Sequence, residues 1–75
     1  MNRDKELFRL AREHVMLTDL LIKDRINEEE YKEDVNEIEM KIIKEGYDVD
    51  KFVEYRKLYR RLTVAEYYEF LKTLD

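Results

Sequence analysis

A helix start can be read in residues 25–31, Arg25-Ile26-Asn27-Glu28-Glu29-Glu30-Tyr31, and again in residues 61–67, Arg61-Leu62-Thr63-Val64-Ala65-Glu66-Tyr67. Asn27 and Thr63 are residue types whose side chains accept hydrogen bonds from the free amides of a first helical turn. The glutamate three positions later can bond back to the capping residue, which completes a capping box. The two stretches therefore predict that one helix begins after Asn27 and another after Thr63.

Apolar residues recur every three or four positions both before and after the first of these stretches, residues 25–31, which predicts one helix on each side of it. The first spans about residues 3–24, with a stripe of Leu7, Leu10, His14, Leu17 and Leu21 that is widened by Phe8, Ala11, Val15 and Ile22. The second spans about residues 28–44, with Tyr31, Val35, Ile38 and Ile42 on its inner side. Gly46 follows as a residue able to adopt the left-handed conformation that closes a helix.

The same periodicity predicts two helices in the remainder of the chain. The third begins after Asp48 or Asp50 and carries Phe52, Tyr55, Tyr59 and Leu62 on its inner side. The fourth runs from Thr63 to the end of the sequence, with an inner face of Val64, Tyr67, Leu71 and Leu74. No glycine or proline separates these two segments, so a single continuous helix remains an alternative.

Composition agrees with a helical chain of one domain, residues 1–75. The 75 residues include one Gly, no Pro and no Cys, whereas sheet proteins need many more turn residues. We therefore expect an all-α fold: a small bundle of three to four antiparallel helices, arranged as two helical hairpins. The absence of Cys excludes disulfides. A closed structural zinc site is not expected either, because the chain has a single histidine and no Cys to serve as ligands.

The residue types needed for common catalytic chemistry are missing. The chain has no Ser or Cys nucleophile, and a single Gly cannot form a phosphate-binding loop. His14 is the only imidazole, and it lies on the apolar stripe, where no carboxylate shares its face. We interpret His14 as a half-buried structural residue. The chain is accordingly expected to be neither an enzyme nor a binder of metals or cofactors.

Charge is unevenly distributed along the chain, whose net charge is −4. Residues 28–39 carry seven acids and one Lys, a local charge of −6, and residues 51–61 carry five bases and one Glu, a local charge of +4. One explanation is that the second and third helices pack antiparallel with these flanks facing each other. The alternative is an exposed binding surface, for which the candidates are Tyr55, Arg56, Lys57, Arg60 and Arg61 on the third helix and Tyr68 on the fourth.

The leading functional hypothesis is a non-catalytic interaction protein that docks a helical face on a protein partner or forms a homo-oligomer. Two of the expected helices are too broadly apolar for one small domain to cover, which supports this hypothesis. Small stoichiometric inhibitors or regulators of the phage type have a similar size and charge. The alternative is a small nucleic-acid-binding regulator that uses the basic edge of the third helix, although the overall acidity opposes phosphate binding. The most apolar run, residues 15–22, is too short to span a membrane, and a cytoplasmic location is expected.

Overall fold

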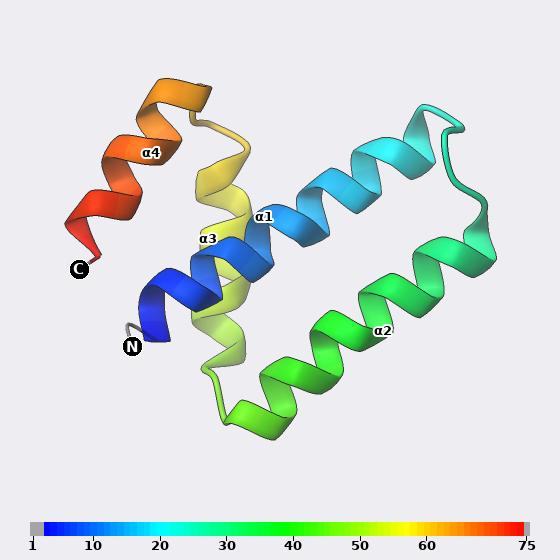
Figure 1. The fold of residues 1–75 in the computed structure, drawn as a ribbon, viewed down its shortest axis with the longest axis horizontal. Helices are drawn as coiled ribbons and strands as arrows, with labels where there is room; N and C mark the ends of the chain where they lie inside the picture. Colours follow the sequence, from blue (N-terminus) through cyan, green and yellow to red (C-terminus); the bar gives the residue numbers. More distant parts are fainter. Residues whose placement is uncertain (1–2, 75) are drawn as a thin grey trace.

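The structure, a computed structural model, describes residues 3–74 and is all-helical (Figure 1). The described residues form four helices, α1 (Arg3–Ile22), α2 (Glu28–Glu45), α3 (Val49–Tyr59) and α4 (Val64–Thr73). Figure 1 shows α1 and α2 as an antiparallel hairpin, α3 crossing α1, and α4 turning back beside α3. The predicted class, a small helical bundle, is confirmed. Within the described part of the chain, no helix is both long enough and apolar enough to cross a membrane.

Local capping residues set the starts of three helices. The Asn27 side chain accepts a hydrogen bond from the Glu30 amide at 2.8 Å, as predicted for the start of α2. Asp48, one of the two candidates for the start of α3, accepts from two amides of the first turn. At Thr63 the full capping box is present, with the reciprocal bonds to Glu66 measuring 3.2 Å and 2.9 Å. The box ends the ambiguity over the last two helices, because α3 stops at Tyr59 and α4 begins separately at Val64.

Replacing Thr63 with Ala tests how much the break between α3 and α4 depends on its cap. The substitution removes the acceptor for the Glu66 amide and should lower the free energy of unfolding by about 1 kcal/mol. Urea denaturation followed by circular dichroism measures this loss. A Thr63→Ser variant keeps the acceptor and should stay close to the wild type. Equal losses in the two variants would show that the hydroxyl does not cap α4.

Two helices end in the same way but with different residues. At the end of α2, Gly46 has a φ of 69°, and Tyr47 donates its amide to the Ile42 carbonyl at 3.0 Å. These are the features of a Schellman cap, which favours glycine because other residues are strained at positive φ. Asp24 occupies the equivalent position after α1 with a φ of 62°, and Arg25 donates its amide to Leu20 at 2.8 Å. The predicted end of the first helix at Asp24 is therefore two residues too long.

α1 is the central element of the core. Its buried residues are Leu7, Phe8, Leu10, Ala11, His14 and Val15. The closest helix packing joins α1 to α3 and α1 to α2. The ring of Phe8 is surrounded by four aromatic rings from the last two helices, those of Tyr55, Tyr59, Tyr67 and Phe70, with centroid separations of 4.8–6.4 Å. The first helix thus brings together segments far apart in the sequence.

The prediction that the second and third helices pack against each other is wrong. Both pack mainly on α1 and make few direct contacts with each other. The ion pairs follow the same arrangement, since Lys41 of α2 contacts Glu6 of α1 at 2.7 Å and Lys51 of α3 contacts Asp4 of α1 at 2.9 Å. The physical reason is that apolar burial fixes the helix positions, whereas exposed ion pairs contribute only up to about 1 kcal/mol each.

Two residues assigned to inner faces are instead exposed. Ile22 lies at the last turn of α1 and Val64 at the first turn of α4, and each is 75% exposed. Both satisfy the helical periodicity of their segments. Helix ends extend past the neighbouring elements here, so periodicity alone overestimates burial at these two positions.

Candidate functional site

The first two predicted binding residues are turned inward. Tyr55 is only 8% exposed and belongs to the core, where its ring meets that of Phe8 at 5.2 Å. It therefore offers little surface to a partner, contrary to its predicted place on the contact surface. Arg56 is half-buried, and its guanidinium lies over the Phe52 ring at 5.1 Å from the centroid. Arg56 stands four residues after Phe52 on the same helical face, a spacing that could have signalled this contact.

Arg56 also contacts the imidazole of His14, a residue of α1. Its Nη1 lies 3.3 Å from both Nδ1 and Nε2 of His14, so the tautomer of the ring decides which nitrogen accepts. The Nε of Arg56 is buried and has no hydrogen-bond partner in the described part of the chain. His14 itself is buried, with its ring edge-on to Phe52 at 5.8 Å. His14 is thus more deeply buried than the half-buried position that the sequence predicted.

The surroundings of His14 favour its neutral form. Burial is the main cause that lowers the pKa of His14 below its ordinary value of 6.5, and the charge of Arg56 lowers it further. Arg60 acts in the same direction, whereas Glu39 opposes them by favouring the protonated ring. The ring is therefore an acceptor for Arg56 at neutral pH, which is the arrangement that the hydrogen bond requires.

This lowered pKa predicts a pH dependence of stability. Between the folded-state pKa and 6.5, the unfolded chain binds a proton at His14 that the folded chain does not bind. The contribution of neutral His14 to the free energy of unfolding is therefore complete above pH 6.5, and it is lost as the pH falls toward the folded-state pKa. Urea denaturation at pH 7.5 and pH 5.5 should show a larger acid-induced loss for the wild type than for His14→Gln, because Gln does not titrate. Parallel losses in both proteins would contradict the assignment.

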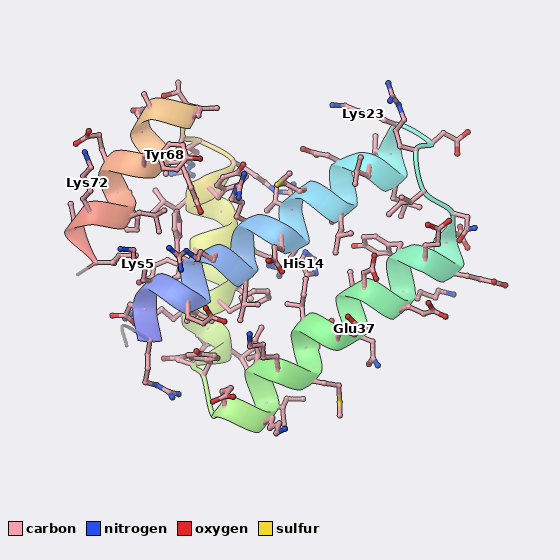
Figure 2. The ribbon with its side chains drawn as sticks, viewed as in Figure 1. Lys5, His14, Lys23, Glu37, Tyr68 and Lys72 are labelled. Carbon is pink, nitrogen blue, oxygen red and sulfur yellow. The ribbon has the colours of Figure 1, made fainter. Side chains whose placement is uncertain are left out.

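The remaining predicted residues are exposed, but the structure does not gather them into one surface. Lys57, Arg60, Arg61 and Tyr68 all lie at the protein surface. Tyr68, labelled in Figure 2, packs on the Tyr67 ring at 5.1 Å, and the guanidinium of Arg12 of α1 lies over that Tyr67 ring, 5.1 Å from its centroid.

The contacts of Tyr68 and of Arg56 place these two residues on opposite flanks of α1. Arg12, on the Tyr68 side, and His14, the partner of Arg56, are two residues apart, which is about 200° around a helix. The predicted contact surface is therefore divided into a basic edge on α3 and a separate tyrosine on α4. Sequence periodicity places residues around their own helix, but it does not place one helix relative to another.

Residues 41–60 contain the end of α2, a turn at Gly46 and α3, which is the element order of a DNA-binding helix-turn-helix motif. That motif needs two consecutive helices that pack closely against each other. α2 and α3 pack instead on α1, and Ile42 is buried in the core that all of them share. The basic edge free for a ligand is also smaller than predicted, because the Arg56 side chain contacts His14.

A groove that the sequence analysis did not identify runs between α1 and α2. Its main hollow, about 330 Å³ in volume, is lined by Glu13, Met16, Leu17, Leu20, Asp34, Glu37 and Ile38. A second hollow of about 210 Å³ shares three of these residues and continues toward Glu6, Arg9, Leu10 and Lys41. We call these two hollows together the α1/α2 groove. Figure 2 shows Glu37 on the part of α2 that runs beside α1.

The floor of the α1/α2 groove is apolar and partly open to solvent. Met16 is 43% exposed and Leu20 is 38% exposed, although both belong to the central helix. Leu20 is about 120° around α1 from both Phe8 and His14, which contact α3 rings. The groove therefore faces away from α3. The predicted stripe of α1 gave no indication of this groove, because Met16 and Leu20 lie beside the stripe.

A second apolar area lies on the other side of α2. Ile43 is 72% exposed, and it lines a hollow of about 240 Å³ together with Val49 of α3 and the ring of Phe52. Met40 is exposed one turn away on α2. Within residues 3–74 there is no group of three or more His, Cys, Asp or Glu side chains placed to hold a metal ion.

Comparisons with protein-family models, with curated proteins and with solved structures find no match. Function is therefore argued from the surface of this chain alone.

Proposed function

We propose that this chain is a non-catalytic interaction module that docks a preformed helical surface on a protein partner, as a small stoichiometric inhibitor or regulator would. The observation that carries the proposal is the exposed apolar floor of the α1/α2 groove. Met16 lies in the second half of α1, the longest helix, and Leu20 lies in its last turn, where its carbonyl accepts the capping hydrogen bond from the Arg25 amide. Such side chains are a liability in a small soluble domain unless another surface covers them.

The rigidity of the groove walls supports the same proposal. Thr18 of α1 and Tyr31 of α2 share a hydrogen bond of 3.0 Å near the loop that joins the two helices. Lys41 and Glu6 join the same two helices near the other end. The groove is therefore held between two cross-links and needs little rearrangement on binding, which lowers the entropic cost of association.

Affinity capture with matched variants tests the proposal. Immobilised wild type should retain a specific protein in near-equal amount, and Leu20→Lys should lose it because a charge would lie on the apolar floor. Lys57→Glu, an exposed change on α3, is the control and should retain the protein. Circular dichroism should show equal helicity for all three chains, since both positions are solvent-accessible.

Sedimentation of the wild type over a range of concentrations completes this test. If the partner is a different protein, the isolated chain should remain a monomer. Retention of the same proteins by wild type and Leu20→Lys would contradict a docking role for the groove. Catalytic turnover by the purified chain would contradict the non-catalytic part of the proposal.

A further inference from the structure

We infer that the α1/α2 groove receives an amphipathic helix with basic flanks, supplied by a protein partner. This inference rests on the proposed interaction function and names the chemistry of the segment that binds. It follows from the shape of the groove, the charges on its two rims and the position of α3.

The shape of the groove suits a third helix. Two antiparallel helices present a straight channel, and a helix laid along it packs its apolar side chains between theirs. The lining residues of α1 extend from Glu6 to Leu20. At 1.5 Å per residue this distance is about 21 Å, the length of roughly four helical turns. The apolar stripe of such a helix would cover Met16, Leu17 and Ile38.

The charges along the rim select the polar flanks of that helix. The main hollow has three ionisable lining residues, Glu13, Asp34 and Glu37, and all are acidic. The structure shows no ion pair to any of the three within residues 3–74. Lysine or arginine side chains beside the apolar stripe of a bound helix would meet these carboxylates from both rims, since Glu13 lies on α1 and the other two on α2.

The charge pattern also distinguishes the two ends of the groove. At the far end, Glu6 is already paired with Lys41, and Arg9 adds a positive charge. Basic groups of the bound helix are therefore expected opposite the Glu13–Asp34 end, and neutral or acidic groups opposite Arg9. This asymmetry would fix the direction in which the helix binds.

Other occupants fit less well. The acidic rim repels the phosphates of nucleic acids and of anionic lipids. A second copy could offer its α3 basic edge, which includes Lys57 and Arg60, but α3 lies across α1 from Leu20. That contact would be head-to-tail and would build rings or open chains instead of a two-fold dimer.

Binding of model peptides tests the inference. The probe is an 18-residue fluorescent peptide with leucines at helical spacing and lysines on both flanks, compared with the same peptide carrying glutamates in place of lysines. The lysine peptide should bind wild type at least about tenfold more tightly, with an affinity that falls as salt rises. Leu20→Lys should weaken its binding by roughly tenfold or more.

A matched pair of charge variants separates the groove from the overall acidity of the chain. Glu13→Gln with Glu37→Gln removes two rim charges, and Glu29→Gln with Glu54→Gln removes two exposed charges outside the groove. The net charges of these variants are equal. Only the first variant should bind the lysine peptide markedly less tightly than wild type does.

Several outcomes would overturn the inference. They are equal binding of the two peptides, failure of the lysine peptide to bind, equal losses in the two charge variants, or concentration-dependent assembly of wild type that Leu20→Lys abolishes. The last result would identify a second copy as the occupant. If the lysine peptide fails while affinity capture still gives a groove-dependent protein, the basic helix is the wrong partner class and the proposed function stands.

Discussion

Replacing Phe8 with Ala should destabilise this chain more than any other change considered. The side chain is fully buried, and its ring contacts rings from both α3 and α4. Removing a buried phenylalanine side chain typically costs about 3–5 kcal/mol, because the surroundings only partly fill the cavity. A domain of this length has a total stability of roughly 4–11 kcal/mol. The substitution should therefore remove a large fraction of the total stability and, at the low end of this range, nearly all of it.

Urea denaturation and near-ultraviolet circular dichroism measure this effect, since the aromatic cluster dominates the near-ultraviolet signal. Val64→Ala, at an exposed position in the first turn of α4, is the control and should change stability by less than about 0.5 kcal/mol. A Phe8→Ala protein as stable as Val64→Ala would show that the cluster of Tyr55, Tyr67 and Phe8 is not the core of the fold.

Replacing Gly46 with Ala should have the second-largest effect on stability, through the backbone alone. No atom lies within 4 Å of the position that a Cβ would occupy, so the substitution creates no clash with a neighbour. The cost arises because Gly46 has a φ of 69°, where an L-residue is disfavoured by about 1–2 kcal/mol. Thermal unfolding should show a lower midpoint for Gly46→Ala with an unchanged helical signal.

Asp24 provides the reciprocal test at an equivalent helix end. Asp24→Gly removes the backbone strain of a non-glycine residue at a φ of 62° and should raise the free energy of unfolding by roughly 0.5–1 kcal/mol. The two changes therefore shift the unfolding midpoint in opposite directions. Shifts of the same sign would show that left-handed geometry does not govern stability at these helix ends.

The local part of the fold could be predicted from the sequence because its determinants are short-range. Thr63, Asn27 and Gly46 set helix boundaries through bonds to residues within a turn of themselves. The end of α1 at Asp24 was not predicted, because aspartate adopts the left-handed conformation less often than glycine and is therefore a weaker sequence signal for a helix end.

The arrangement of the helices could not be predicted in the same way. Opposite charges on α2 and α3 suggested a direct pairing, but Lys41 and Lys51 both pair with α1. Apolar periodicity placed Leu10 on the inner stripe, but it gave no sign that Leu20, beside that stripe, lines a groove with α2. Which side of a helix is covered depends on the directions of the other helices, and those directions follow from packing across the whole chain.

The position of Phe8 has a consequence during synthesis of the chain. This ring packs on aromatic neighbours that follow it in the chain as far as residue 70. The α1/α2 hairpin can form as soon as residue 46 is available, but the part of the Phe8 ring that packs on Tyr67 and Phe70 stays uncovered until α4 has been translated. A nascent chain that lacks α4 therefore leaves the Phe8 ring partly uncovered, and such a species is prone to aggregation or to capture by a chaperone.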